Sequence, residues 1–263
     1  MKQIVRLPKV YLSVVLGVIY LPILLVVIYS FNENKLSSAW GGFSLKWYRI
    51  LFQDTVLFQA MCNSLTLAFL TSLCAAIIGT LGAVGMQQLQ SRTKGPIEFL
   101  STISIIIPEI ILGMVFMTFF ALLGLPFGMI TLVIAHTAFC IPYIFMLVKA
   151  RLVGMDKSLA EAARDLGASK TQVFFDITLP LIIPAILSGM LLSFAMSLDD
   201  VIISLFVTGV DVNTLPIMIY SQLKFGVTPE INALCTLMLL VTILLVILFY
   251  LVGIPKEPRI FKK

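Results

Sequence analysis

Long apolar runs separated by short polar segments dominate the chain. Six runs reach the roughly 20 residues that a helix needs to cross a bilayer core. They are Val10–Phe31, Ser64–Met86, Phe99–Leu123, Phe127–Val148, Leu181–Val207 and Ile231–Gly253. Because a helix satisfies its own backbone polar groups in lipid, the pattern predicts an all-α membrane protein with six transmembrane helices. Pro108 and Pro184 lie within two of the runs, where a proline kinks or ends a helix.

The pattern has no internal repeat and no linker, so it predicts one transmembrane domain over residues 1–263. A basic segment precedes the first run, which makes a cleaved signal peptide the alternative to a first transmembrane helix. The run is longer than the apolar core of a signal peptide, and no small-x-small cleavage site follows it. We therefore expect the first helix to be retained.

Lysine and arginine are distributed unevenly between the two sides of this layout. The side of the N-terminus holds 14 of them, and the opposite side holds 4. Because basic segments stay in the cytoplasm, both termini are predicted to be cytoplasmic. The outer loops are then about residues 32–63, 124–126 and 208–230, and the inner loops are about residues 87–98 and 149–180.

Composition narrows the function classes. The chain is 60% hydrophobic and 12% charged, with a mean hydropathy of +1.07, which excludes a soluble enzyme, a disordered chain and a nucleic-acid binder. The four cysteines are scattered among apolar residues and indicate no disulfide framework or metal site. No phosphate-binding G-x-x-x-x-G-K-[ST] motif is present, and the single histidine supports no catalytic triad. We expect no catalytic site, no metal and no cofactor on this chain.

A polar segment, Met155–Gly167, interrupts the second inner loop and is predicted to form a short helix. Asp156 or Ser158 can cap its N-terminus, and Gly167 suits the left-handed position that ends a helix. A second helix is expected after this glycine, with a capping box at its start formed by Ser169 and Gln172.

The resulting helix–glycine–helix elbow lies at the inner membrane surface. Such an elbow is suited to transmit a conformational change from a soluble partner protein. The alternative is an ordinary amphipathic helix that lies on the lipid headgroups.

The elbow resembles the EAA loop of bacterial ATP-binding cassette importer permeases. The motif positions are occupied by Glu161, Ala162, Ala163, Gly167, Ile177, Leu179 and Pro180. The six-span layout and the segments 193–201 and 228–234 also resemble the spermidine/putrescine permease subunits of this family. The resemblance implies a MetI-like type I importer fold in the bacterial cytoplasmic (inner) membrane. It also implies that the loop at about residues 149–180 docks onto an ATPase subunit.

The same resemblance implies a set of partners. The assembly would contain a second permease subunit, two ATPase subunits that hold ATP and Mg, and one external polyamine-binding protein. This chain would contact membrane lipid and the polyamine substrate, and no nucleic acid.

Three carboxylates and one histidine lie inside the proposed spans, which contain no lysine or arginine. Glu109 falls near the middle of its span, and Asp199 and Asp200 fall slightly outward of the middle of theirs. Ionisable residues in a membrane normally face a bundle interior or a water-filled path. These acids predict a path for a cation. Alternatively, an aspartate caps a broken helix or pairs with a partner subunit. His136 is more typical of an interhelical hydrogen bond than of a proton relay.

These observations favour a permease subunit of a polyamine importer. One alternative keeps the cassette architecture and changes the cargo to iron, thiamine, an anion or a sugar. Another is a proton-coupled secondary transporter in which Glu109 or Asp199 carries the proton, although many such transporters show an internal repeat. An intramembrane aspartyl protease is a poor match, because its two aspartates come from separate helices.

Overall fold

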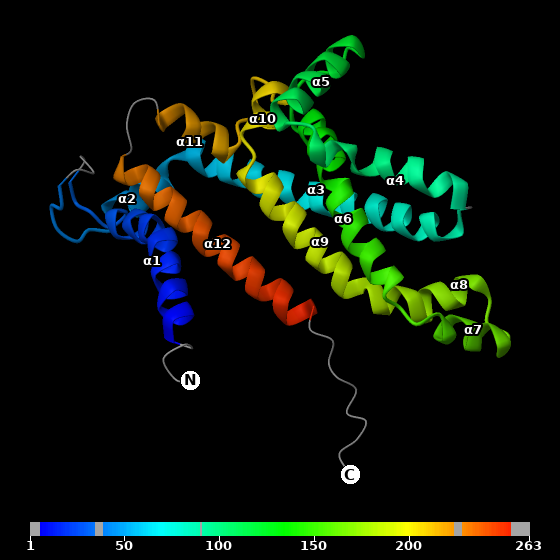
Figure 1. Cartoon of the computed structure of the whole chain (residues 1–263). Coiled ribbons are helices and arrows are strands. Elements are labelled where there is room, and N and C mark those ends of the chain that lie inside the picture. The colour runs from blue at the N-terminus through cyan, green and yellow to red at the C-terminus, as the bar shows by residue number, and fades with distance from the viewer. Residues whose placement is uncertain (1–5, 35–38, 90, 224–227, 254–263) are drawn as a thin grey trace. The chain divides into compact units, whose positions relative to one another are not determined.

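The computed structural model describes residues 6–34, 39–89, 91–223 and 228–253, and nearly all of them are helical. The helices are α1 (Arg6–Tyr29), α2 (Lys46–Gln53), α3 (Thr55–Gln88), α4 (Ser91–Ile106), α5 (Glu109–Leu122), α6 (Met129–Val153), α7 (Lys157–Asp165), α8 (Lys170–Val173), the π-helical segment η1 (Phe174–Thr178), α9 (Leu179–Asp199), α10 (Ile202–Val207), α11 (Leu215–Leu223) and α12 (Pro229–Gly253). Figure 1 labels most of them along the chain. The terminal residues 1–5 and 254–263 lie outside the described residues, so the prediction that both termini are cytoplasmic stays a prediction.

Five helices of the described ranges are long and apolar enough to cross a membrane, and the count becomes six when the bent pair α4 and α5 is one span. The prediction of six apolar spans is therefore confirmed, but two of the predicted runs are broken. The run Phe99–Leu123 is not a straight helix, because α4 and α5 meet at 105°, and the turn is visible in Figure 1. Pro108 explains the break, since it lacks a backbone donor and disfavours a helical conformation at the residue before it.

The run Leu181–Val207 is also broken, so its prediction as one continuous helix is wrong. Helix α9 ends at Asp199, and α10 begins at Ile202. No proline lies at this break. It coincides with the two adjacent aspartates, whose side chains compete with the backbone for hydrogen bonds. The three acids that the sequence singled out inside the spans thus lie at the two helix breaks.

The described contacts gather into two compact units, one formed by residues within 1–59 and 219–244 and the other by residues within 60–218 and 245–263. In the first unit, Asn32 organises the loop after α1. Its side chain donates to Ala39 O at 2.8 Å and accepts from Gly41 N at 2.7 Å, and its carbonyl accepts from Trp47 Nε1 at 2.7 Å. The prediction of a single domain over residues 1–263 stays a prediction.

The second unit has its core around α6. Ile144 is fully buried there and packs against glycines of two other helices. A Cβ atom at Gly79 of α3 would lie 3.1 Å from Ile144 Cβ, and one at Gly189 of α9 would lie 3.0 Å from Ile144 Cγ1. Small residues allow helix backbones to approach closely, which is how membrane helices associate. Both α3 and α9 are therefore held tightly to α6.

Helix α5 packs equally closely against α10. A Cβ atom at Gly113 would lie 2.5 Å from Phe206 Cδ2, so Gly113→Ala must displace that ring. We expect the substitution to destabilise the chain by about 1–3 kcal/mol, measured as a lower midpoint of thermal unfolding in detergent. Gly85→Ala is the matched control, because among the described residues nothing lies within 4 Å of that position. Equal midpoints for the two variants would contradict the close α5–α10 contact.

Candidate functional site

The elbow begins at helix α7. Asp156 is its N-cap, since Asp156 Oδ1 accepts a hydrogen bond from Ser158 N at 2.9 Å. Of the two candidate caps in the sequence, the structure selects Asp156, and Ser158 lies inside the first turn. Because the Ser158 N–H stabilises the charged form, the pKa of the Asp156 carboxyl lies below its ordinary value.

This cap makes the first turn of α7 dependent on pH. A lowered pKa in the folded state stabilises the turn above the ordinary carboxyl pKa, and this stabilisation is lost as the pH falls through the lowered value. We expect the protection factors of the α7 amides, which correct for the intrinsic pH dependence of exchange, to fall below about pH 4 and to be lower in Asp156→Ala than in the wild type at neutral pH. Hydrogen exchange followed by mass spectrometry measures both effects. Exchange in Asp156→Ala that matches the wild-type rate at neutral pH would contradict this assignment.

The turn of the elbow is built on Gly167. This residue has φ +90°, a left-handed conformation that favours glycine. Gly167 N donates to Arg164 O at 2.9 Å, and Ala168 N donates to Ala163 O at 3.0 Å. The two bonds form a Schellman motif, so the predicted role of Gly167 at the end of the helix is confirmed.

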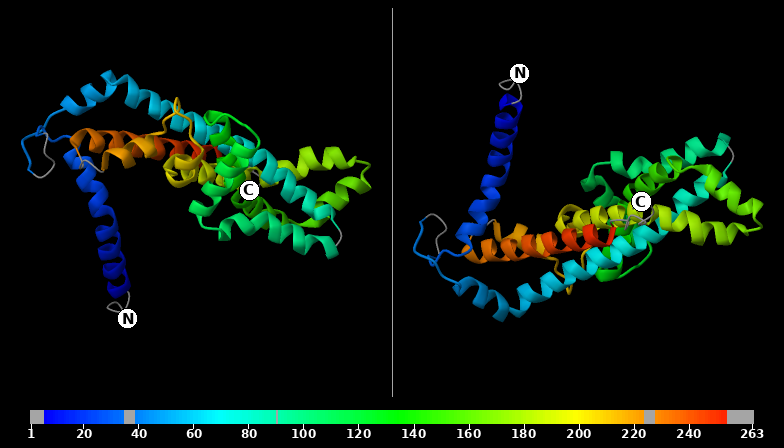
Figure 2. Two further views of the ribbon diagram at one scale, coloured as in Figure 1. Left: turned by 90° about the horizontal axis from the view of Figure 1, so that it is seen from above. Right: turned by 90° about the horizontal axis from the view of Figure 1, so that it is seen from below.

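Helix α8 starts with the predicted capping box. Ser169 N donates to Gln172 Oε1 at 2.8 Å, and Gln172 N donates to Ser169 Oγ at 3.3 Å. After α8 the chain passes through the π-helical segment, which contains Ile177, into α9, which starts with Leu179 and Pro180. Figure 2 shows the elbow at the end of α9. Single π-helical turns inside α-helices are frequent at functional sites.

An apolar strip on α7 is left uncovered by the residues that the structure describes. Leu159 is 50% exposed and Leu166 is 89% exposed, and Ala162 between them is also exposed. Ala163 is half-buried. Leucines this exposed at the end of a rigid turn mark a surface for another protein or for lipid.

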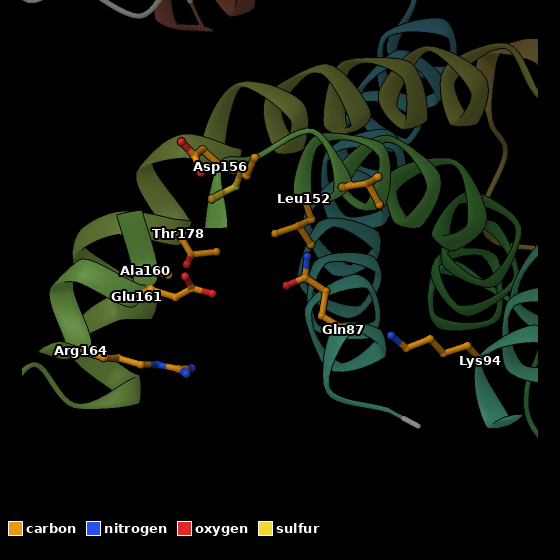
Figure 3. Close-up of a pocket in the computed structure, with 10 residues that line it drawn as sticks. Gln87, Lys94, Leu152, Asp156, Ala160, Glu161, Arg164 and Thr178 are labelled. Carbon is orange, nitrogen blue, oxygen red and sulfur yellow. The ribbon is translucent and has the colours of Figure 1, made fainter. Parts of the chain in front are cut away.

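The opposite side of α7 borders a cavity of about 410 Å³ between the elbow and the ends of α3, α4 and α6. Glu161 and Arg164 point into it from α7, and Gln87 and Lys94 lie across from them (Figure 3). Beside this cavity, Lys149 of α6 forms an ion pair with Glu98 of α4. The first residue of the motif thus borders this cavity, and it is exposed in this chain as Leu159 and Leu166 are.

The three acids inside the spans lie at the two helix breaks, and the structure brings them together. Glu109 is the first residue of α5, Asp199 is the last residue of α9, and Asp200 follows it. Glu109 lies close enough to both aspartates for their charges to interact. Tyr143 of α6 is close enough to interact with Glu109 and was not a sequence candidate. The sequences of α5, α9 and α10 contain no lysine or arginine.

The two adjacent aspartates have different surroundings. Asp199 is exposed from this chain, whereas Asp200 is 8% exposed. Asp200 caps α10, because its oxygens accept from Ile203 N at 3.2 Å and from Ser204 N at 2.8 Å. The alternative that one aspartate caps a broken helix therefore describes Asp200. Asp199 and Glu109 are less buried than Asp200, and their role in a cation path stays a prediction.

His136 of α6 is buried and connects the two helices at the break. Its Nδ1 lies 2.9 Å from Ser197 Oγ, and its Nε2 lies 3.0 Å from Ser204 Oγ. Asp200 Oδ2 is 3.4 Å from Nε2. The predicted interhelical role of His136 is confirmed. No pattern in the sequence indicated its serine partners, which are 61 and 68 residues away along the chain.

A cluster of carboxylates without nearby lysine or arginine attracts a positively charged guest. Within the described ranges, no group of three or more His, Cys, Asp or Glu side chains has the arrangement of a metal site. The geometry therefore places negative charge at the helix breaks and a rigid elbow at one end of α9.

The spans, the broken helices and the elbow define a multi-pass transport permease. The chain belongs to the family of binding-protein-dependent transport system inner membrane components, whose pattern it matches over residues 75–256. It is accordingly an inner-membrane protein.

Relatives with known roles match nearly the whole chain. The spermidine/putrescine transport system permease protein PotC of Haemophilus influenzae is 40% identical, and the match covers 94% of this chain and 96% of that protein. The putrescine transport system permease protein PotI of Escherichia coli K12 is 41% identical, with 98% and 95% covered.

Solved structures show the same fold. A chain of a bacterial ABC transporter involved in the import of the acidic polysaccharide alginate superposes with a TM-score of 0.75 at 16% identity, covering 96% of this chain and 97% of that one. A chain of the MetNI methionine ABC transporter in an inward-facing conformation gives a TM-score of 0.65 at 17% identity and covers 76% of this chain. The predicted MetI-like permease fold is confirmed.

Proposed function

We propose that this chain is the permease subunit of an ATP-driven importer of polyamines such as spermidine and putrescine. The observation that carries the proposal is the near full-length similarity to permeases named for these two cargoes. The cluster of Glu109 and Asp199 supports it independently, because a polyamine presents ammonium groups on an apolar stem.

The elbow is the docking element for an ATPase subunit. The exposed strip formed by Leu159, Ala162 and Leu166 is apolar, and it is small enough for the surface of a partner to approach closely. The turn at Gly167 ends in hydrogen bonds that fix the angle between α7 and α8. Motion of the ATPase on ATP binding then reaches α9 through Ile177, Leu179 and Pro180. This chain itself binds no nucleotide and catalyses no reaction.

The cation path runs along the helix breaks. Glu109 and Asp199 attract the ammonium groups of the cargo, and Tyr143 supplies an aromatic wall beside Glu109. The path is completed by a second permease subunit. An external binding protein delivers the cargo, and two ATPase subunits with ATP and Mg act on the cytoplasmic side, where both termini lie.

Uptake by proteoliposomes that contain the whole assembly tests this proposal. We expect accumulation of labelled spermidine or putrescine that needs ATP on the elbow side and the binding protein on the other side. Uptake driven by a proton gradient without the ATPase would contradict the ATP-driven assignment. Uptake of iron, thiamine, a sugar or an anion, with no polyamine uptake, would contradict the cargo.

A further inference from the structure

The polar contacts of His136 do more than join two helices, because they reach Asp200 of the two adjacent aspartates. His136 comes from α6, and its three polar neighbours lie on both sides of the break, namely Ser197 before it and Ser204 and Asp200 at the start of α10. The ring is 1% exposed. No other histidine exists in the chain.

The chemistry of these neighbours determines the direction of the hydrogen bonds. An ionised Asp200 carboxylate only accepts hydrogen bonds, so the Nε2 atom that faces it carries the proton and donates. Nδ1 then accepts from the Ser197 hydroxyl, which is 2.9 Å away. Both nitrogens of the ring thereby have a polar neighbour.

The neighbouring backbone bonds complete the arrangement. Asp200 already accepts from Ile203 N and Ser204 N, and the His136 ring lies beside the same Oδ2 atom that accepts from Ser204 N. Asp200 is therefore held against α10 by three groups. Asp199 has an exposed side chain and lies on the other side of the break, within electrostatic reach of Glu109.

We propose that His136 is a positioning residue of the cation path, which locks Asp200 into its capping role so that Asp199 and Glu109 face the cargo. This inference rests on the proposed function, because it assigns the acids of the same path. His136 touches no cargo and acts only through the break between α9 and α10.

A double-mutant cycle tests the proposal in a strain whose chromosomal copy is deleted and replaced by variants, so that the native partners are present. His136→Leu keeps the ring volume approximately and removes all three polar interactions. Because hydrogen bonds to a charged group are strong, we expect polyamine uptake to fall by about tenfold or more. His136→Gln retains one donor and one acceptor, and we expect it to restore uptake to within about threefold of wild type.

The decisive measurement is the effect of His136→Leu in an Asp199→Asn background. If His136 acts by leaving Asp199 to the cargo, the further loss shrinks to within about twofold, because the group that it positions is already gone. If the ring only stabilises the fold, the loss has the same factor in both backgrounds, and the proposal is overturned. Full uptake by His136→Leu alone also overturns it.

Two further variants keep the test decisive if His136→Leu does not accumulate in the membrane. Ser197→Ala removes one partner of the ring, and its cycle with Asp199→Asn is read in the same way. Ser193→Ala lies on the same helix one turn earlier and removes a buried hydroxyl that has no hydrogen-bond partner among the described residues; we expect it to leave uptake unchanged. Equal losses in Ser197→Ala and Ser193→Ala would overturn the proposal. Absence of polyamine uptake by the wild type would instead contradict the proposed function.

Discussion

Replacing Gly167 with valine is expected to abolish polyamine uptake while the chain still inserts and assembles in the membrane. The residue has φ +90°, and a left-handed conformation costs an L-amino acid roughly 1–2 kcal/mol, with a β-branched side chain at the unfavourable end. Among the described residues nothing lies within 4 Å of a Cβ atom there, so the penalty comes from the backbone and not from a clash.

In the variant, this strain would be relieved if the backbone at position 167 rotated out of the left-handed region. That rotation would break the Schellman hydrogen bonds that end α7. We expect uptake to fall by more than tenfold, with ATP hydrolysis no longer stimulated by the loaded binding protein. Both rates are measured on the purified assembly in proteoliposomes.

Two substitutions serve as controls for this effect. Gly167→Asn should retain most of the activity, because asparagine tolerates the left-handed conformation. Gly154→Ala changes a glycine with φ −82° in the same loop and should have little effect. Wild-type uptake by Gly167→Val would show that the angle of the elbow does not matter for coupling.

The second large effect is expected from neutralising the acids that face the cargo, in Glu109→Gln and Asp199→Asn. Two opposite unit charges about 6 Å apart attract by about 2.8 kcal/mol at an effective dielectric constant of about 20. Removal of one such attraction corresponds to a loss of about 10- to 100-fold, where the screening by nearby water sets the lower figure. Initial uptake rates over a range of cargo concentrations measure this loss.

Asp211→Asn is the matched control for the loss of a carboxylate, since Asp211 is exposed in the turn after α10 and is not a residue of either break. It should transport normally. The acid variants should insert and assemble as the wild type does, because neither side chain is needed for the cap of α10. Unchanged uptake in both acid variants would remove them from the path.

Much of this architecture follows from local rules in the sequence. The length of the apolar runs predicts the spans because a bilayer fixes the length of a crossing helix. The elbow is predicted in detail because caps and glycine turns depend on residues within a few positions of one another, as at Gly167 and Ser169. The sequence of the elbow therefore contains most of the information that determines its structure.

Local rules do not predict the geometry of the helix breaks, nor the different surroundings of Asp199 and Asp200. Pro108 predicts a kink but not a bend of 105°, and the close contact of Gly113 with Phe206 joins residues far apart along the chain. Asp199 and Asp200 are equivalent in the sequence, and the difference between them arises from His136 and Ser204. Such contacts between distant residues leave no periodic signal.

The unbroken helical run from Lys170 to Asp199 has a mechanical consequence. It contains 30 residues, or about 45 Å at 1.5 Å per residue, and one of its ends is the elbow while the other is an acid of the break. A tilt of about 5° about the elbow end would displace Asp199 by about 4 Å on this length. Such a displacement is comparable to a hydrogen-bond length, so a small rotation at the motor side suffices to release an ammonium group at the far end of the same helix.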